Sequence, residues 1–544
     1  MRIFALGGLG EIGRNLTVVE YGGRLLVIDA GVLFPGSDHP GVDVILPDFE
    51  PIRPRWADVD AILLTHGHED HIGAIPSLLA ERSDIPVYGS RFTLALVRER
   101  LREHRIVADL REVSAERIRL GPDGQWDAEF IAVTHSIPDA CAIALRTPAG
   151  VVVHTGDIRL DPVPIDGRVT DIHALARLGE EGVDLLLIDS TNADVPGWVP
   201  SERAVGPVLD GLIGAAGGRV LVASFSSHVH RVTQVITAAV AHGRRVAFVG
   251  RSMLRTMRLA RELGYLPVPD HALIGIEEAL ALPAHEVVIV TTGSQGEAMS
   301  ALARMANGDH QVRLNPSDTV IFAASVVPGN EESVTRVVNA LARIGVPVIG
   351  PDQAGVHVSG HAAAGELLLL YSILRPSNVM PIHGELRHLR ANAALAELSG
   401  VAAERIIRAT DGVVVDLVDG RIAVAGSLPC GYVYLDNSGA GEVSEATLKD
   451  RRVLGEEGIL TVVAVVDVAA RRVIAGPEIH ARGFVGAAGE LAEGESLARR
   501  ALEQALTGDM VDSVTLSQAV RRAVGRWVGS QRRRPMIVPV IVES

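Results

Sequence analysis

The chain has 544 residues, a hydrophobic content of 47% and a net charge of −15 at pH 7. This length and composition exclude a disordered chain and a single hydrophobic core, so two to four globular domains are expected. The chain has two cysteines, which excludes a disulfide framework and a cysteine-rich zinc site. It has no apolar run of about 18 residues, which excludes a membrane span. It also lacks a signal-peptide pattern, which predicts a cytoplasmic protein.

A glycine pattern near the N-terminus, Gly8-x-Gly10-x-x-Gly13, follows the first strand-like run and matches the dinucleotide-binding fingerprint. That fingerprint requires a helix next. Residues 16–21 are instead strand-like and are followed by a Gly-Gly turn and another strand. We therefore predict a β-hairpin at this point and no dinucleotide cofactor.

The first part of the chain, residues 1–200, alternates strand-like apolar runs with turn signals and helical stretches. This alternation predicts an α/β domain. Helices are expected at 71–82 and 92–104. The expected strands are 25–28, 61–64, 130–133, 151–153 and 185–188.

The most informative segment is Thr65-His66-Gly67-His68-Glu69-Asp70-His71, directly after an apolar strand and directly before a helix. Imidazole and carboxylate groups suit Zn²⁺ or Mn²⁺. Ligands two positions apart in a loop can converge on one ion. Asp70 and His71, at the start of the helix, face another direction and can serve a second ion. The segment therefore predicts a transition-metal site.

Five other apolar runs end in a residue that can bind a metal. Functional sites in layered α/β folds gather at the carboxyl ends of strands, so these side chains are expected to lie together. A single aspartate in such a place is more often a turn or cap residue, but the recurrence at five strands favours a shared site. The five residues are Asp29, His135, Asp157, Asp189 and His383.

From residue 201 to residue 356 the pattern changes to that of a parallel, doubly wound sheet. A strand of the first type then returns at 378–382, within a segment 357–450 that we assign to the first domain and a linker. The second domain is therefore predicted to be inserted into the first, and residues 451–544 to form a small C-terminal α/β domain. In the inserted domain, strands are expected at 219–223, 245–249, 286–290, 319–323 and 346–350, and helices at 231–241 and 333–344.

Two polar segments can bind phosphate. Residues 224–231, Ser-Phe-Ser-Ser-His-Val-His-Arg, lie between a strand and a helix, whose N-terminal amides suit a phosphate group. Plain N-capping explains this segment equally well. Residues 357–361 are ambiguous in the same way. The candidate residues are Ser226, His228, His357, Val358, Ser359, Gly360 and His361.

The histidine-rich motif resembles that of a known superfamily. His66-x-His68-x-Asp70-His71, with His135 in Thr-His-Ser-Ile-Pro-Asp and Asp157 in Thr-Gly-Asp, is similar to the motif set of the metallo-β-lactamases. The inserted domain and the later segments Ser-Gly-His and Pro-Ile-His-Gly-Glu resemble the β-CASP branch of nucleases. Within that branch, the chain resembles the ribonuclease J family over essentially its whole length. The fold implied is a metallo-β-lactamase αββα sandwich with an inserted β-CASP α/β domain and a small C-terminal α/β domain.

The resemblance implies a role for each site residue. His361 would contact the scissile phosphate or protonate the leaving oxygen, and the segment 357–361 would bind the RNA backbone. Asp29 and Asp189 would orient metal ligands. The metal ligands implied are His66, His68 and His135 for the first ion, Asp70, His71 and His383 for the second, and Asp157 for both. A structural calcium site is implied at Gly41, Asp43 and Asp436, where glycine offers only its carbonyl.

The activity implied is that of a two-metal ribonuclease in RNA maturation and decay, including rRNA processing and mRNA decay. It would combine 5′-to-3′ exonuclease action on 5′-monophosphate RNA with endonuclease action, using two Zn²⁺ or Mn²⁺ ions about 3.5–4 Å apart. Single-stranded RNA is the expected partner, and the chain is expected to form a homodimer or homotetramer. The acidic net charge argues against a nucleic-acid partner only when it is taken alone, since a local groove of arginines and metal ions can bind phosphate.

Three other functions are open to this sequence. A small-molecule hydrolase on the same scaffold is disfavoured, because such enzymes lack the inserted domain and His383. A DNA-processing β-CASP nuclease is disfavoured because its residue at the position of His383 is typically apolar. An inactive scaffold of an RNA-processing complex would have lost metal ligands, whereas this chain keeps all seven.

Overall fold

The computed structural model describes residues 1–36, 38–114, 116–327, 329–436, 441–484, 490–508 and 511–544. These residues divide into two compact units. The larger unit consists of residues 1–34 and 45–433, and the smaller unit of residues 35–44 and 434–544. No helix in the described part of the chain is long and apolar enough to span a membrane.

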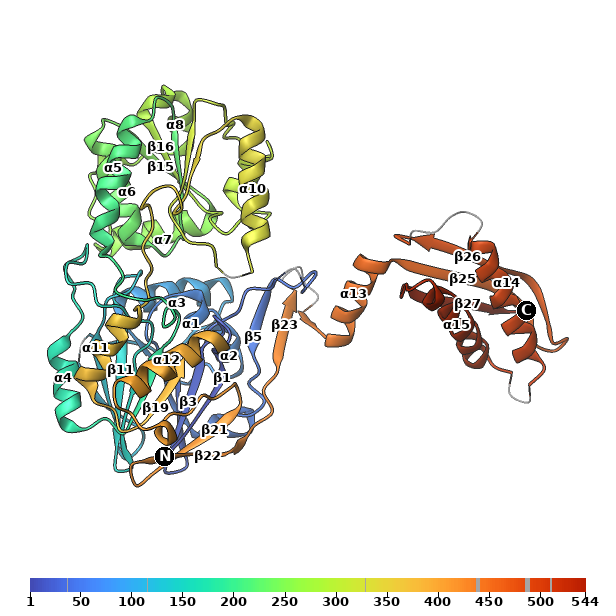
Figure 1. The fold of residues 1–544 in the computed structure, drawn as a ribbon, viewed down its shortest axis with the longest axis horizontal. Coiled ribbons are helices and arrows are strands. Elements are labelled where there is room, and N and C mark those ends of the chain that lie inside the picture. Colours follow the sequence, from blue (N-terminus) through green and yellow to red (C-terminus); the bar gives the residue numbers. More distant parts are fainter. Residues whose placement is uncertain (37, 115, 328, 437–440, 485–489, 509–510) are drawn as a thin grey trace. The chain divides into compact units, whose positions relative to one another are not determined.

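Two sheets stack face to face in the larger unit (Figure 1). The first has the strand order β22-β21-β1-β3-β4-β6-β7-β8 and the second the order β19-β13-β12-β11-β10-β9. Apolar side chains from both sheets, such as Leu26, Phe130 and Leu187, form the core between them. The strands of the first sheet are β1 (Arg2–Gly7), β3 (Leu16–Tyr21), β4 (Arg24–Ile28), β6 (Val59–Leu63), β7 (Val87–Gly89), β8 (Leu110–Glu112), β21 (Val413–Val418) and β22 (Arg421–Ser427). Those of the second are β9 (Arg117–Leu120), β10 (Trp126–Ala132), β11 (Cys141–Thr147), β12 (Gly150–His154), β13 (Leu185–Asp189) and β19 (Val379–Ile382).

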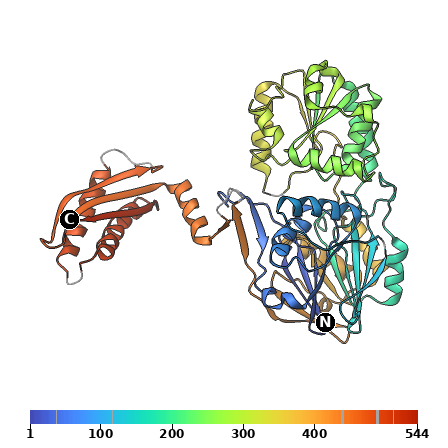
Figure 2. The ribbon, with the colours of Figure 1, turned by 180° about the vertical axis from the view of Figure 1, so that it is seen from behind.

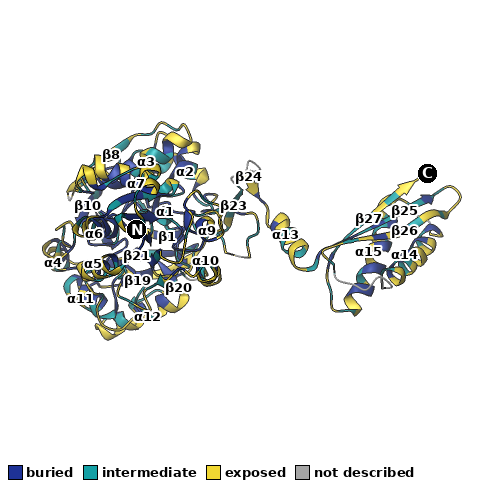
Figure 3. Cartoon of the chain, turned by 90° about the horizontal axis from the view of Figure 1, so that it is seen from above, coloured by how far each residue is buried: buried dark blue, intermediate teal, exposed yellow. Residues whose placement is uncertain are grey.

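Helices cover the outer faces of both sheets, which completes the αββα sandwich predicted from the sequence. On the second sheet, α4 (Ile172–Glu181), α11 (Ala364–Leu374) and α12 (Leu386–Leu398) share one buried cluster with the strands. On the first sheet, α3 (Arg91–Glu103) contacts β7 and β8. The buried residues gather inside this unit (Figure 3). The predicted hairpin at residues 16–28 is confirmed, because β3 pairs antiparallel with β4.

The single helix predicted at 71–82 is wrong. The structure has two short helices, α1 (Glu69–Ile72) and α2 (Ile75–Glu81), with Gly73 and Ala74 between them. Pro76 lies in the first turn of α2. A proline inside a continuous helix would lack its N–H group and would clash with the carbonyl four residues earlier, so the first helix must end. The break turns α1 into a separate one-turn support for Asp70 and His71.

The inserted domain has five parallel strands in the order β15-β16-β14-β17-β18, with helices on both faces (Figure 2). Two buried clusters, one on each face, include Val222 and Ile289 respectively. This is the doubly wound sheet that the sequence predicts. Its strands are β14 (Val220–Ala223), β15 (Arg245–Val249), β16 (Val287–Thr291), β17 (Thr319–Phe322) and β18 (Val348–Ile349). Its helices are α5 (Val205–Ala215), α6 (Val229–Ala241), α7 (Arg251–Glu262), α8 (Ile276–Ala281), α9 (Ala301–Ala306) and α10 (Glu331–Ile344).

The smaller unit contains the predicted C-terminal α/β domain. Its sheet has the order β26-β25-β27, in which β25 pairs antiparallel with β26 and parallel with β27. Two helices pack on one face of this sheet through residues such as Leu460, Leu502 and Val524. The elements are α13 (Glu445–Glu457), β25 (Ile459–Asp467), β26 (Arg472–Arg482), α14 (Glu490–Leu506), α15 (Ser513–Ser530) and β27 (Met536–Glu543).

Candidate active site

The structure brings together all seven residues predicted to bind metal, at the carboxyl ends of strands in the two stacked sheets. The loop after β6 carries His66 and His68, and α1 carries Asp70 and His71. The other three follow β10, β12 and β19, and are His135, Asp157 and His383. Because the sheets face each other, ends from both of them meet at one edge of the sandwich.

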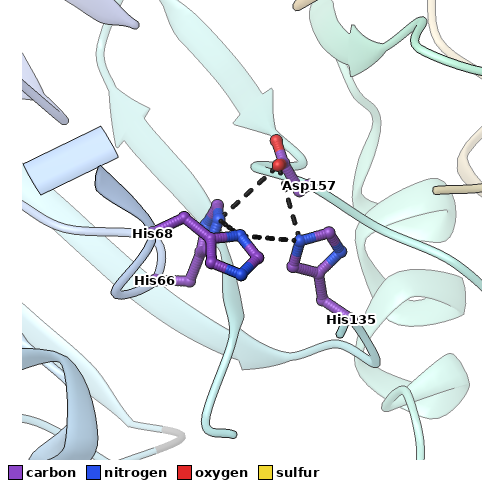
Figure 4. A group of neighbouring side chains, drawn as sticks. All are labelled: His66, His68, His135 and Asp157. Atoms are coloured by element: carbon purple, nitrogen blue, oxygen red, sulfur yellow. Dashed lines mark hydrogen bonds and ion pairs between the residues drawn. The ribbon is translucent and has the colours of Figure 1, made fainter. Parts of the chain in front are cut away.

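Four residues form the first group of possible metal ligands (Figure 4). Nδ1 of His68 lies 3.0 Å from Nε2 of His66 and 3.1 Å from Nε2 of His135. Oδ2 of Asp157 lies 3.5 Å from Nε2 of His66 and 3.6 Å from Nε2 of His135. Ligand atoms about 2.1 Å from a tetrahedral ion are separated by roughly 3.4 Å, so these four atoms fit the corners of one coordination shell.

The second group shares Asp157 with the first. Its other oxygen, Oδ1, lies 3.3 Å from Nε2 of His71 and 3.5 Å from Nδ1 of His383. Oδ2 of Asp70 completes the group, 3.7 Å from Nε2 of His71 and 3.3 Å from Nε2 of His383. One carboxylate therefore faces both groups, with one oxygen toward each.

The charge state of the residues fits a pair of bound cations. Oδ1 of Asp157 is buried and has no hydrogen-bond partner in the described part of the chain, which is costly for a carboxylate unless a cation binds it. Burial lowers the pKa of His68 to about 4 and holds the pKa values of His66 and His135 well below their usual value, so all three are neutral and can bind metal.

The second group has excess negative charge. Burial opposes protonation of His383, but the carboxylates of Asp157, Asp189 and Asp70 outweigh burial and raise the pKa of His383 to about 10. The pKa of His71 is raised in the same way. These carboxylates thus require positive charge at this point, and a divalent ion supplies it without protons on the imidazoles.

Asp29 orients the imidazole ring of His71 through a contact with its Nδ1 atom. Oδ2 of Asp29 lies 2.8 Å from Nδ1 of His71, which leaves Nε2 of that ring to face the second group. Asp29 is itself fixed by Thr65, whose backbone N–H donates to Oδ1 at 2.8 Å and whose hydroxyl donates to Oδ2 at 2.7 Å. Thr65 was not predicted as a site residue. Its position at the strand end, directly before the first histidine, is the signal that could have identified it.

Asp189 links His361 to the second group. Its Oδ2 lies 2.8 Å from Nδ1 of His361, and its Oδ1 lies 3.4 Å from Nδ1 of His383 and accepts a 2.9 Å hydrogen bond from the Thr191 hydroxyl. Burial disfavours the imidazolium of His361, but Asp189 outweighs burial and raises the pKa of His361. The His361 ring lies 5.0 Å from the ring of His135 and stacks 5.4 Å from that of His383. His361 therefore lies beside both groups, held by one nitrogen. Thr191 was missed by the sequence analysis.

The segment 357–361 is held close to the first group. Gly360 accepts a hydrogen bond from Nδ1 of His135 at 2.7 Å, and a Cβ atom on Gly360 would lie 2.8 Å from that ring, so only glycine fits. Asn192 donates to the hydroxyl of Ser359 at 2.8 Å and to the carbonyl of His361 at 3.0 Å. Asn192 was also missed, although it follows the strand that ends in Asp189.

A buried glutamate on α11 supports the same segment. Glu366 is fully buried, and its carboxylate accepts backbone hydrogen bonds from Leu160, Val199 and Ala363 at 2.8–3.0 Å. These three amides belong to the loop after Asp157, the link into the inserted domain and the segment after His361. One carboxylate thus joins three segments that converge on the site.

The serine-rich segment 224–231 lies at the carboxyl end of β14. The residue that caps α6 is His228, and no serine side chain caps that helix, so the N-capping alternative is not supported. The Ser224 hydroxyl and Nδ1 of His228 are buried and have no partner among the described residues. Burial, together with the nearby Arg231, holds the pKa of His228 well below its usual value. The segment therefore contains buried polar groups that no described residue satisfies.

Arg231 joins this segment to residues 356–357. Its guanidinium is fully buried and forms two hydrogen bonds with the Glu202 carboxylate, at 2.5 and 2.8 Å. It also donates to the carbonyl of Val356 at 2.9 Å and lies 3.3 Å from Nδ1 of His357. Burial and Arg231 lower the pKa of His357 to about 3. The two predicted phosphate-binding segments therefore meet at one buried ion pair.

Replacing Arg231 with methionine is expected to lower the free energy of unfolding by about 3–5 kcal/mol, because the Glu202 carboxylate would stay buried without its partner. Arg336→Met is the matched control, since Arg336 pairs with Glu332 in the same domain but both side chains are exposed. The control should change the stability by about 1 kcal/mol or less. Urea unfolding measures both values, and equal losses would contradict the importance assigned to the buried pair.

The predicted calcium residues lie in the smaller unit. The carbonyl of Gly41 and the carboxylate of Asp436 both face the Arg451 guanidinium, with contacts of 2.8 and 3.3 Å. The N–H of Asp43 donates to the Leu435 carbonyl at 2.9 Å. Arg451 thus already supplies positive charge to two of the three residues, and a calcium ion here stays a prediction.

Two known protein families match parts of the sandwich in the larger unit. Residues 9–178 match the metallo-beta-lactamase superfamily, and residues 353–406 match the family described as Zn-dependent metallo-hydrolase RNA specificity domain. A crystal structure of a protein of unknown function from Enterococcus faecalis V583 has a similar fold, with a TM-score of 0.50 at 16% identity over 70% of this chain and 94% of that chain. The chain is therefore a metallo-hydrolase of the metallo-β-lactamase fold that binds a divalent metal.

Family matches to the inserted and C-terminal domains identify the branch of these metallo-hydrolases to which the chain belongs. Residues 217–341 match the Ribonuclease J beta-CASP domain, and residues 446–544 match the Ribonuclease J C-terminal domain. Ribonuclease J of Mycobacterium tuberculosis is 52% identical over 100% of this chain and 97% of its own length. Ribonuclease J of Thermus thermophilus is 41% identical over 100% of this chain and 95% of its own length. The chain belongs to the ribonuclease J family, and it is a metal-dependent ribonuclease.

Proposed function

We propose that this ribonuclease uses two Zn²⁺ or Mn²⁺ ions to hydrolyse single-stranded RNA. It degrades RNA from a 5′-monophosphate end in the 5′-to-3′ direction and cuts internally, more slowly, when that end is blocked. The observation that carries the proposal is the pair of ligand groups that share Asp157, with one carboxylate oxygen facing each group. Purified protein is expected to contain up to two transition-metal ions per chain.

This geometry supports the ligand assignment that the family resemblance implies. His66, His68 and His135 would hold one ion, Asp70, His71 and His383 would hold the other, and Asp157 would bridge them. When bound, the ions supply an activated water molecule and stabilise the negative charge that develops on the phosphate. Asp29 and Asp189 contact Nδ1 of His71 and of His383, which would leave Nε2 of each ring to hold an ion. Asp189 occupies Nδ1 of His361, so Nε2 of that ring is the nitrogen that would contact the phosphate or give a proton to the leaving oxygen.

The 5′ end is assigned to the surface formed by the segments 224–228 and 357–361. The amides at the start of α6 and the hydroxyl of the partly exposed Ser226 can donate hydrogen bonds to a phosphate. His228 and His357 are neutral, and Arg231 is committed to Glu202. The binding groups near the two segments are thus mostly uncharged donors, which suit one phosphate better than the larger charge of a triphosphate.

A comparison of 5′-monophosphate, 5′-triphosphate and 5′-hydroxyl forms of one RNA tests this assignment. The monophosphate form should be degraded fastest, by about tenfold or more, because loss of one or two charge-assisted hydrogen bonds costs roughly 1.5–3 kcal/mol. Product sizes should show successive removal of 5′ nucleotides. Equal rates on the three forms, or release of nucleotides from the 3′ end, would remove the phosphate site and leave a general metal-dependent ribonuclease. A matched DNA oligonucleotide is the control for the rival DNA-processing function.

Several finer points belong to the same proposal. We assign residues 1–200 and 357–450 to the metallo-β-lactamase domain and linker, residues 201–356 to the β-CASP domain and residues 451–544 to the C-terminal domain. We also expect a cytoplasmic homodimer or homotetramer, which sedimentation of the purified chain would test. Roles in rRNA processing and mRNA decay follow from the family resemblance.

A further inference from the structure

Positive charge is concentrated in one segment of the smaller unit, although the whole chain has a net charge of −15. Residues 513–542 contain no Asp, Glu or Lys. They contain the six arginines Arg521, Arg522, Arg526, Arg532, Arg533 and Arg534. Three of these lie on α15 and three directly follow it. A run of this kind in an acidic protein suggests a surface for a polyanion.

The packing of α15 places its arginines in solvent. Val520, Val524 and Trp527 are buried against the rest of the unit. At 100° per residue, Arg522 and Arg526 fall on the opposite side of the helix, about 6 Å apart along its axis, and both are exposed. Gly525 and Gly529 lie on this same side and contribute no side chains. Nε of Arg522 donates to the Gln518 carbonyl of the same helix at 3.3 Å.

The arginines after the helix extend this surface. Arg532 and Arg534 are exposed, and the Arg533 guanidinium lies 5.8 Å from the centre of the Phe484 ring. No carboxylate in the described part of the chain forms an ion pair with any of the six guanidinium groups. The nearest acidic contact is Glu457, which accepts a 3.3 Å hydrogen bond from the backbone N–H of Arg534.

Two ordinary roles for these arginines do not account for them. Cations near the end of a helix stabilise its dipole, but that effect fades within one turn and does not reach Arg521 or Arg522, which lie more than two turns before the end of α15. Exposed arginines of the larger unit such as Arg117 and Arg387 form surface ion pairs with Asp127 and Asp194. The C-terminal arginines have no such partners among the described residues.

We propose that Arg521, Arg522, Arg526, Arg532 and Arg534, named here the C-terminal arginine surface, bind the phosphate backbone of substrate RNA independently of its sequence. The inference rests on the proposed function, since the chain's own substrate is the polyanion that would occupy the surface. Guanidinium groups recognise phosphate through paired N–H donors and are weakly hydrated, which favours RNA as the partner. The surface would add affinity for long RNA that the active site by itself does not provide.

The test measures RNA affinity of the full-length chain carrying His68→Ala, which prevents cleavage. Arg522→Gln/Arg526→Gln removes two charges from the surface. Arg471→Gln/Arg472→Gln is the control, because it removes two exposed arginines from the β25–β26 turn of the same unit. Each variant is titrated with 5′-monophosphorylated RNAs of about 5 and about 30 nucleotides, because one single-strand binding site covers about 4–16 nucleotides and the shorter RNA fills no more than one.

The surface variant should bind the longer RNA about 25-fold more weakly at 0.1 M salt, with a salt dependence reduced by about 1.4, since each lost phosphate contact removes about 0.7 from the slope. Its affinity for the short RNA should not change, and the control should stay within about twofold of the parent for both RNAs. Equal affinities of the surface variant and the control for the longer RNA would overturn the inference. So would an altered oligomeric state with unchanged RNA affinity, which would assign the surface to contacts between copies of the chain.

The same surface variant in a chain with His68 intact separates this inference from the proposed function. Normal cleavage of the short RNA, together with unchanged affinity for the longer one, would reject only the arginine surface. Absence of metal-dependent cleavage by the unsubstituted chain would reject the proposed function.

Discussion

Replacement of His68 by alanine is expected to abolish RNA cleavage, by roughly 10³-fold or more, while the chain stays folded. Nδ1 of His68 lies 3.0 and 3.1 Å from the ligand nitrogens of His66 and His135, so its loss removes one corner of the first metal group. The His68 ring is partly exposed at the edge of the sandwich, so its removal leaves the core intact. Single-turnover assays measure RNA cleavage, elemental analysis measures the metal content, and thermal unfolding shows whether the chain stays folded.

Asp157→Ala should have an equally large effect and should lower the content of both metals, because Asp157 faces both groups. The control is His285→Ala, since His285 is exposed and lies outside all three groups of possible ligands. It should retain full activity and metal content. Full activity of the His68→Ala protein after metal removal would reject the two-metal mechanism.

Replacement of His361 by alanine is expected to retain both metals and to lower turnover by roughly 10²–10³-fold, within the range lost when a group that transfers a proton is removed. His361 is held through Nδ1 by Asp189 and stacks on the ring of His383. It belongs to neither the first nor the second group of possible metal ligands, which meet at Asp157. Its loss should therefore act on kcat more than on metal affinity. Elemental analysis and steady-state kinetics on one RNA separate the two effects.

An opposite assignment of His361 is testable in the same experiment. Asp157, Asp189, His361 and His383 form a third set whose ligand atoms lie close together. If His361→Ala loses one metal ion, then His361 belongs to that set as a ligand. His361→Gln is the companion variant, because its amide can still bind a phosphate but cannot supply a proton at neutral pH.

The apolar runs of the sequence predicted an α/β first domain and the inserted doubly wound domain, because buried parallel strands are short apolar runs that stand out from their surroundings. The strand at residues 245–249, for example, has the predicted bounds. The αββα sandwich itself was implied by the resemblance to the metallo-β-lactamases. The single helix predicted at 71–82 is wrong because the apolar spacing continues through Gly73 and Ala74, whereas the helical backbone is interrupted just before Pro76. The spacing of apolar residues shows only which side chains can be buried. The interruption of the helix depends instead on the backbone N–H group that a proline lacks, which the apolar spacing does not report.

The seven candidate metal ligands could be predicted from the sequence for a related reason. Each one follows an apolar run, so its position at a strand end can be read locally. The residues that orient them could not be read in this way. Thr191 and Asn192 have no periodic pattern, and their contacts with His383 and Ser359 join residues 192 and 167 positions apart. The burial of Arg231 is likewise invisible in sequence, because it depends on Glu202, 29 positions away.

The order of strands in the first sheet also means that this sheet is completed late in the synthesis of the chain. β1 pairs with β3 soon after it is made, but its second neighbour, β21, begins only at Val413. The inserted domain, whose parallel strands all lie between residues 220 and 349, can fold while the sandwich around it is still incomplete. His383 leaves the ribosome after that domain, and the second metal group lacks a ligand until then. A nascent chain that ends just before His383 therefore holds the segments 224–231 and 357–361 but lacks one of the seven residues that form the two ligand groups sharing Asp157.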